Sequence, residues 1–181
     1  LYKSKSISQR RCLINLLLVN QFIFKNILME EIIQIKDTAK FLSDKGITSA
    51  EVGIVLGTGL HQFLNHVELK QTIPYSEIPG FPLSTVEFHK GHLIYGSIAN
   101  KNVLIMQGRF HAYEGYSMQQ IVFPIRVMKV LGVKQLFLSN AAGGINLNFK
   151  KADLVLIDDH INLQKGNPLM GKNMEELGPR F

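Results

Sequence analysis

Two stretches of the chain show the apolar spacing of an amphipathic helix. Over residues 30–43 apolar side chains recur every three or four positions, and Gly46 follows as a helix stop. The same spacing is found over residues 117–131, where Ser117 and Gln120 at the start fit a capping box. Each helix is therefore predicted to bury one face against another layer of the fold.

Five shorter apolar runs predict β-strands. They cover residues 51–56, 92–99, 103–106, 133–138 and 153–157. The first run is short, apolar and rich in β-branched residues, which is typical of buried strands in a parallel sheet, and the fourth is interpreted as a second buried strand. These two strands are therefore predicted to lie inside the sheet, covered on both faces.

The connections between these runs predict the fold class. A polar turn joins the second run to the third, which predicts a β-hairpin. The helix over residues 117–131 lies between the third and fourth runs, which predicts a βαβ unit with parallel strands and a right-handed crossover. Residues 72–84, rich in proline, and residues 162–181 are expected to be irregular. The predicted fold is α/β, with a central mixed, partly parallel sheet flanked by helices.

Glycine turns follow two of the predicted strands. Thr58 lies between two glycines after the first strand, and Gly143 and Gly144 lie shortly after the fourth. Arg109 follows the third strand. Ligands of α/β sheets bind beyond the carboxyl ends of the strands, and the amides of glycine turns can approach an anion closely. The pattern favours an anion site, although a structural tight turn explains either glycine motif equally well.

Residues 107–116 concentrate the polar chemistry of the chain. Arg109, His111 and Tyr113 occupy alternate positions. A guanidinium binds phosphate oxygens two at a time, an imidazole donates or titrates, and a phenol suits a ribose edge. On an extended segment this spacing places all three side chains on one face. The alternative is that Arg109 pairs with Glu114 on the surface while the tyrosines pack a loop.

Composition and charge narrow the classes of function. A chain of 181 residues that is 46% hydrophobic is long enough for one well-buried domain. The net charge is +6, but residues 1–28 contribute five positive charges, so residues 29–181 carry a net charge of only +1. We therefore expect no nucleic-acid partner. The single cysteine excludes an internal disulfide and is compatible with a reducing compartment.

Residues 1–28 form a basic and then apolar leader. This order resembles a signal peptide, but polar residues interrupt the apolar run, which is too short to span a bilayer, and no small-residue cleavage site follows. We expect residues 1–28 to be a non-native or disordered leader without a role in the fold, and no membrane association. Residues 29–181 are then the N-terminal part of a single domain that suits the cytoplasm. Detection of an exported, processed form would contradict this expectation.

Other polar residues are weaker candidates. Asp158, Asp159 and His160 contain metal-ligating groups, but the geometry is tight and no further ligand cluster is evident, so no metal is expected. For His89 and His92 a solvated or core role is the default.

Several motifs taken together resemble the trimeric class of purine nucleoside phosphorylases. They are Gly57-Thr58-Gly59-Leu60, Ser84-Thr85-Val86 with His89, Gly108–His111 with Tyr113–Tyr116, Asn140–Gly144 and Asp159–Leu163. They follow one another in unbroken order over residues 30–181. The resemblance implies a cytoplasmic homotrimer in purine salvage that converts purine (deoxy)ribonucleosides such as inosine and guanosine, with inorganic phosphate as co-substrate, to the free base and (deoxy)ribose 1-phosphate. It implies no cofactor and no metal.

The resemblance also implies the roles of individual residues. Thr58, His89, Arg109, His111 and the backbone of Ala141 match the phosphate contacts of the family, and Arg109 and His111 are the expected catalytic residues. Phe110 lies within the phosphate-binding loop, where only its backbone is expected to matter. Tyr113 matches the tyrosine near the ribose. Phosphate would attack C1′ of the ribose while positive charge builds on the sugar, so the site needs to hold an anion beneath that carbon.

The chain also departs from the family pattern. The residues that read the purine come from a later segment in the family, so we expect a fold that is incomplete at the C-terminus, with a phosphate site but no complete purine pocket. His61 stands where glycine is usual and would be strained if that position needs a positive φ. The loop after Leu163 is shorter than in the mammalian members, so no aromatic lid from a neighbouring subunit is assigned.

Three other functions were weighed. A methylthioadenosine phosphorylase shares the fold and the attacking phosphate, but Asn140–Gly144 favours the purine nucleoside member. The chain could instead be a catalytically incomplete remnant that binds phosphate or nucleoside. A glycosidase with paired carboxylates is disfavoured because the motif cluster is basic.

Overall fold

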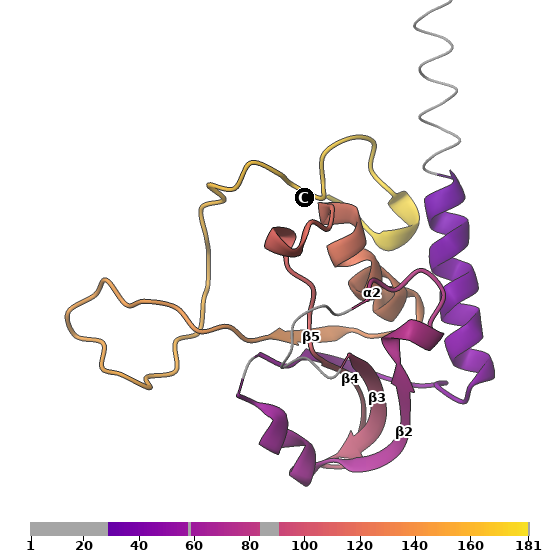
Figure 1. The fold of residues 1–181 in the computed structure, drawn as a ribbon, viewed down its shortest axis with the longest axis horizontal. Coiled ribbons are helices and arrows are strands. Elements are labelled where there is room, and N and C mark those ends of the chain that lie inside the picture. Colours follow the sequence, from indigo (N-terminus) through magenta and orange to yellow (C-terminus); the bar gives the residue numbers. More distant parts are fainter. Residues whose placement is uncertain (1–28, 58, 84–90, 181) are drawn as a thin grey trace, which may run out of the picture.

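The computed structural model describes residues 29–57, 59–83 and 91–180 (Figure 1). The leader of residues 1–28 lies outside the described residues, as do two predicted phosphate contacts, Thr58 and His89. None of the helices in the described part of the chain is long and apolar enough to cross a membrane.

A five-stranded mixed sheet forms the centre of the fold. Its strands are β1 (Val52–Val55), β2 (Glu68–Pro74), β3 (His92–Ile98), β4 (Lys101–Gln107) and β5 (Gln135–Leu138). Their order in the sheet is β2-β3-β4-β1-β5. β1 is parallel to both β4 and β5, whereas β2, β3 and β4 pair antiparallel. The predicted mixed, partly parallel sheet is confirmed.

The hairpin of β3 and β4 has a tighter turn than predicted. Ala99 and Asn100 form the turn, with φ values of 48° and 61°. Positive φ at both central residues is typical of the type I′ turn, whose twist matches that of the flanking strands. The hairpin itself is confirmed.

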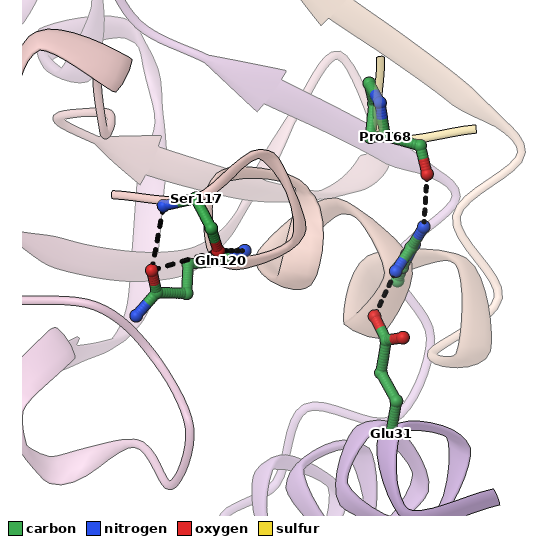
Figure 2. Close-up of polar contacts among 5 residues, drawn as sticks. Glu31, Ser117, Gln120 and Pro168 are labelled. Atoms are coloured by element: carbon green, nitrogen blue, oxygen red, sulfur yellow. Dashed lines mark hydrogen bonds and ion pairs between the residues drawn. The ribbon is translucent and has the colours of Figure 1, made fainter. Parts of the chain in front are cut away.

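The predicted βαβ unit is built from β4, the helix α2 (Met118–Val130) and β5. α2 begins after Ser117, whose side-chain oxygen accepts a hydrogen bond from the Gln120 backbone N–H at 3.2 Å. In return, the Gln120 side-chain oxygen accepts from the Ser117 backbone N–H at 2.9 Å (Figure 2). The capping box therefore satisfies two donors that the first turn of a helix leaves without partners. The helix and the parallel strands are confirmed, and β1 lies between β4 and β5.

Each face of the sheet carries an apolar cluster. A helix over residues 29–44 and α2 cover one face, where Leu42, Leu104 and Val127 are fully buried. The short 3-10 helix η1 (His61–His66) packs on the other face, against a smaller cluster that includes Ile105. Because neighbouring residues of β4 point to opposite faces, both clusters draw on this strand. Burying one Leu or Ile side chain contributes about 1.5–3 kcal/mol, so β4 is a main stabilising element.

Arg126 joins three parts of the chain that are distant in sequence. It pairs with Glu31 of the first helix, and its Nη2 donates to the Pro168 carbonyl at 3.2 Å (Figure 2). The side chains of Arg126 and Glu31 are only 14% and 20% exposed, so solvent screens this pair less than a surface pair. The contacts hold the first helix and the C-terminal segment against α2.

β5 differs from its prediction. It was predicted to be a buried strand, but all four of its residues are exposed. The physical reason is that β5 lies at the sheet edge, beyond the two apolar clusters: among the described residues neither cluster includes a residue of β5, so both of its faces are open. The prediction of a strand from this apolar run is confirmed, but the prediction that the strand is buried was wrong.

Two further predictions about strands were wrong. Residues 153–157 form no strand, and Leu154 and Leu156 are 100% and 95% exposed. A strand needs a neighbour to complete its backbone hydrogen bonds, and no ladder in the described structure includes these residues. Within residues 72–84, which were predicted to be irregular, β2 continues to Pro74 and the 3-10 turn η2 (Tyr75–Glu77) follows. β2 was missed because it is an edge strand with mostly polar, exposed residues.

Candidate active site

The carboxyl ends of β4, β1 and β5 lie at one edge of the sheet. The parallel register places Val55 opposite both Met106 and Leu138, so the three strands end at the same level. The loops that follow them therefore begin side by side. They are the Arg109 segment after β4, the Gly57–Gly59 turn after β1 and residues 139–144 after β5.

Ser139, the first residue after β5, bonds to both of the other loops. Its side-chain oxygen accepts from the Gly57 backbone N–H at 3.0 Å and donates to the Val55 carbonyl at 3.3 Å. Its backbone carbonyl accepts from Nη1 of Arg109 at 2.6 Å. One half-buried serine thus fixes the guanidinium of Arg109 next to both glycine turns.

The loops approach each other closely at Gly57. A Cβ at this position would lie 3.1 Å from both the carbonyl and the side-chain oxygen of Ser139. Gly59, two residues later, adopts a left-handed φ of 88°, which other residues rarely adopt. The glycines of this turn thus serve a structural role, and the same turn places backbone groups at the edge where an anion would bind.

Buried aromatic side chains contact the backbone around Arg109 from the core side. Tyr75 is 1% exposed, and its hydroxyl donates to the Gly108 carbonyl at 2.8 Å. Phe110 is 5% exposed, with its ring 5.2 Å from that of Tyr75 and 5.9 Å from that of Tyr116. Burial raises the pKa of Tyr75, so its hydroxyl stays a neutral donor at ordinary pH. Both neighbours of Arg109 are therefore fixed in the core.

We expect Tyr75→Phe to lower the free energy of unfolding by about 1–2 kcal/mol, because the Gly108 carbonyl would lose its buried donor. Urea unfolding followed by circular dichroism measures the change. Tyr95→Phe is the matched control, since the Tyr95 hydroxyl makes a long contact of 3.4 Å with Ser49 Oγ. Its effect is expected to stay below about 0.5 kcal/mol. Equal losses in the two variants would contradict a special role for the Tyr75 hydroxyl.

His111 and Tyr113 stack on each other at the surface of this edge. Their rings are 4.7 Å apart and inclined by 17°. The segment is not extended throughout, because residues Ala112–Glu114 form the 3-10 turn η3. Glu114 causes the turn: its carboxylate accepts from the His111 backbone N–H at 2.9 Å, while the His111 side chain accepts from the Glu114 N–H. The Tyr113 ring, 76% exposed, lies over the imidazole and is open to a ligand.

Residues 51–181 match the model of the phosphorylase superfamily. The chain belongs to this superfamily. It is 52% identical over 147 residues to purine nucleoside phosphorylase 1 of Geobacillus stearothermophilus, a match that covers 81% of this chain and 54% of that protein. It is 46% identical over 149 residues to purine nucleoside phosphorylase of Bos taurus, covering 81% of this chain and 52% of that one.

Solved structures show the same relation. The crystal structure of a Schistosoma purine nucleoside phosphorylase in complex with hypoxanthine superposes with a TM-score of 0.74 at 45% identity. That match covers 81% of this chain and 52% of the solved chain. The complex of the Schistosoma mansoni enzyme with acetate gives a TM-score of 0.76 at 46% identity. The chain thus spans about half the length of the relatives it matches.

Within this phosphorylase fold, the predicted site residues that the structure describes lie at one edge of the sheet. Arg109 and His111 follow β4, and Ala141 lies exposed two residues after Ser139. The Phe110 side chain is directed into the core, which leaves its backbone to line the loop. His61 lies in η1 and is not among the described residues with a positive φ, so the strain considered for this position is absent.

Sequence reasoning missed two residues that shape the candidate site. Ser139 could have been noticed as the first polar residue between an apolar strand and the glycine-rich turn. Tyr75 gave no signal, because it lies in a stretch that was predicted to be irregular. Among the described residues, no group of three or more His, Cys, Asp or Glu side chains is arranged to hold a metal ion. Asp158, Asp159 and His160 are all exposed.

Proposed function

We propose that this chain forms the phosphate and ribose side of a purine nucleoside phosphorylase active site. The reaction is phosphorolysis of purine (deoxy)ribonucleosides such as inosine and guanosine, which yields the free base and (deoxy)ribose 1-phosphate for purine salvage. The observation that supports it most is the contact of Arg109 with Ser139, which joins the loops after three parallel strands within a phosphorylase fold. Relatives that are 46% to 52% identical carry the name of this enzyme.

In the proposed mechanism, inorganic phosphate is the nucleophile and the protein positions it. Arg109 is the principal phosphate ligand, because its planar guanidinium matches two oxygens and Ser139 fixes its orientation. Thr58, His89, His111 and the amide of Ala141 are proposed to complete the phosphate shell. The Phe110 backbone belongs to the same loop. An anion held in this way is charge-complementary to the sugar as it becomes positive.

The reaction forms one bond and breaks another at the same carbon. A phosphate oxygen attacks C1′ as the glycosidic bond from C1′ to the purine nitrogen breaks. The bonding electron pair leaves with the purine, which takes up a proton. Tyr113 is proposed to contact the ribose, since its ring is exposed and held in place over His111. His111 lies beneath it and is assigned together with Arg109 to the catalytic group.

The remaining parts of the proposal concern partners and setting. No metal or other cofactor is proposed, since phosphate itself supplies the nucleophile. The groups that read the purine are proposed to lie in the part of the relatives that this chain does not match. A cytoplasmic homotrimer is proposed on the basis of the resemblance to the trimeric class.

Calorimetry with the 181-residue chain tests the proposal. Inorganic phosphate is expected to bind, whereas inosine alone is expected to bind weakly or not at all, because this chain supplies only one side of the site. Titration with ribose 1-phosphate, which contains both the phosphate and the sugar, is expected to give tighter binding than phosphate. A chain that binds neither phosphate nor ribose 1-phosphate would contradict the proposed site.

A further inference from the structure

A wide groove lies between three parts of the chain that are distant in sequence. Its walls are the helix of residues 29–44, α2 and the segment of residues 168–180, which is drawn in yellow in Figure 1. Its volume is about 1150 Å³, whereas pockets for small ligands enclose about 300–1000 Å³. None of the proposed phosphate or ribose contacts that the structure describes lines it. This α2 groove is therefore separate from the candidate active site.

Hydrogen bonds fix the shape of the outer wall of the α2 groove. Within this wall, Nδ2 of Asn173 donates to the Gly178 carbonyl at 3.1 Å. Nη2 of Arg180 donates to the Gly171 carbonyl at 2.5 Å, which closes a loop of the same segment. A ligand would therefore meet a wall that is already formed, and binding would not require the whole segment to become ordered.

The floor and one side of the α2 groove are apolar. Ile125 of α2 and Leu177 of the outer wall line the groove and pack against the larger apolar cluster. Leu169 and Met170 are 51% and 74% exposed, and Met174 is half-buried. Methionine is unbranched and adapts to partners of different shape, which makes it common on surfaces that bind several partners. The groove can therefore accept apolar side chains.

The described residues that line the α2 groove include four cations and one acid. Arg126 and Glu31 form an ion pair, so their charges cancel (Figure 2). Lys129, Lys172 and Arg180 form no ion pair with any acid in the described part of the chain. The groove thus combines three uncompensated positive charges with apolar side chains. This combination fits a ligand that is both acidic and partly apolar.

Arg180 also has a donor without a hydrogen-bond partner. Its Nε is buried and has no acceptor among the described residues. A buried N–H without a partner costs about 1–3 kcal/mol. A rotation of the guanidinium toward a carboxylate in the groove would satisfy this donor. Arg180 is therefore the residue that would gain most from an acidic ligand.

Nearby parts of the chain do not supply the missing negative charge. Glu175 and Glu176 belong to the outer wall, but neither lines the α2 groove, and Glu176 pairs with Lys36 of the helix of residues 29–44. Residues 1–28 hold five basic residues and no acidic one, so this leader has the wrong charge for the groove. The charge of the groove therefore calls for a separate acidic ligand.

We propose that the α2 groove binds an acidic peptide segment of a partner protein. Apolar side chains of the peptide would pack on Ile125 and Leu177. Carboxylates on either side of them would meet Lys129, Lys172 and Arg180, and the planar guanidinium can hold one carboxylate with two hydrogen bonds. The inference uses none of the proposed catalytic roles, so it holds or fails independently of the phosphorylase reaction.

The apolar floor favours a peptide over other anions. Inorganic phosphate has no apolar group to place on the floor. Nucleic acid presents continuous rows of phosphates, which need a broader basic surface than three cations. A peptide that mixes Asp or Glu with Leu or Phe supplies both kinds of group, and an extended peptide suits a groove larger than an ordinary small-ligand pocket.

Fluorescence anisotropy tests the proposal with two labelled peptides that differ only in charge. The acidic peptide is Glu-Leu-Glu-Phe-Glu-Leu, and its counterpart has Lys in place of every Glu. We expect the 181-residue chain to bind the acidic peptide at least about tenfold more tightly. Binding is expected to weaken as salt is raised, because salt screens the exposed lysines. Inorganic phosphate at matched ionic strength is expected not to displace the peptide, since the candidate active site lies elsewhere.

Charge variants locate the peptide on the chain. Arg180→Gln is expected to weaken binding about tenfold, because a hydrogen-bonded charge is lost. Lys172→Gln, at an exposed position, is expected to cost about threefold. Lys134→Gln is the matched control, since Lys134 is equally exposed and does not line the groove. Its effect is expected to stay below about 1.5-fold. Circular dichroism checks that each variant keeps the fold.

An apolar pair of variants tests the floor and its side. Met170→Ser is expected to weaken binding about threefold, because an apolar contact is lost. Met29→Ser changes a comparably exposed methionine that does not line the groove, and is expected to leave binding unchanged.

Four outcomes would overturn the inference. The first is no binding of the acidic peptide, and the second is equal binding of the acidic and basic peptides. The third is an equal loss for Arg180→Gln and Lys134→Gln, which would show attraction by net charge alone. The fourth is displacement of the peptide by inorganic phosphate, which would place the peptide at Arg109 instead.

Discussion

Arg109→Gln is expected to weaken the binding of inorganic phosphate about 100-fold and to leave the fold intact. The guanidinium is positioned by the Ser139 carbonyl at the edge where three loops meet. Hydrogen bonds to a charged group contribute about 1.5–3 kcal/mol each, and glutamine keeps a polar side chain but neither the charge nor the planar pair of donors. The loss corresponds to about 2.8 kcal/mol, at about 1.4 kcal/mol for each factor of ten. Isothermal titration with phosphate measures it.

Two further variants separate charge from geometry. Arg109→Lys keeps the positive charge but loses the fork of donors, so an intermediate loss of about tenfold is expected. Lys129→Gln removes one positive charge from an exposed position on α2 and is expected to change phosphate affinity by less than about twofold, because salt screens exposed charges. Equal losses for Arg109→Gln and Lys129→Gln would mean that phosphate responds only to net charge. That result would contradict a specific site at Arg109.

Local patterns predicted most of the elements correctly because their causes lie in short stretches of sequence. The spacing of Ile35, Ala39 and Leu42 identifies a buried helix face, and all three are buried against the sheet. Ser117 and Gln120 form the capping box that their spacing of three predicts. The meeting of the strand ends was predictable as well, since parallel strands joined by a crossover must end at the same edge.

The predictions that failed depend on partners distant in sequence. The apolar residues of β5 look like those of a central strand, but burial requires packed layers on both faces of the sheet, and neither apolar cluster of the described residues includes a residue of β5. Residues 153–157 have the composition of a strand but no strand partner in the part of the chain that the structure describes. Composition therefore predicted the tendency to form a strand, while the presence of a neighbour decided whether these residues were paired and covered.

The sequence identified residues of the candidate site but not the hydrogen bonds that connect them. Motifs placed Arg109 and the glycine turns at strand ends, but the bond from Arg109 to Ser139 joins residues that are 30 positions apart. The alternation of Arg109, His111 and Tyr113 would place all three side chains on one face only if the segment were extended. Hydrogen bonds between His111 and Glu114 produce a turn instead. Such a capping arrangement with histidine at the first position lies outside the usual Ser and Thr pattern.

Gly96→Ala is expected to lower the free energy of unfolding by about 2–3 kcal/mol, a large loss for the addition of one methyl group. Gly96 lies in β3, opposite Leu69 of β2, where the register of the two strands shifts between Leu69 and Gln71. A Cβ at Gly96 would lie 2.6 Å from the Glu68 carbonyl oxygen and 2.7 Å from Val67 Cγ1. Backbone cannot rotate away as a flexible side chain can, so β2 would have to shift. Overpacking of this kind costs about 1–3 kcal/mol. The shift of β2 would also weaken its backbone hydrogen bonds to β3 and add to this loss.

Gly143→Ala is the control that isolates this close approach. A Cβ at Gly143 would meet no atom within 4 Å, and Gly143 is not among the described glycines with a positive φ. In both variants alanine reduces the conformational freedom of the unfolded chain, which stabilises the folded protein by about 0.4–1 kcal/mol. This contribution cancels when the free energies of unfolding of the two variants are compared. Urea unfolding of the two variants side by side should therefore show a loss for Gly96→Ala and no loss for Gly143→Ala. If Gly96→Ala unfolded at the same urea concentration as Gly143→Ala, β2 could not lie as close to β3 at this position as the structure places it.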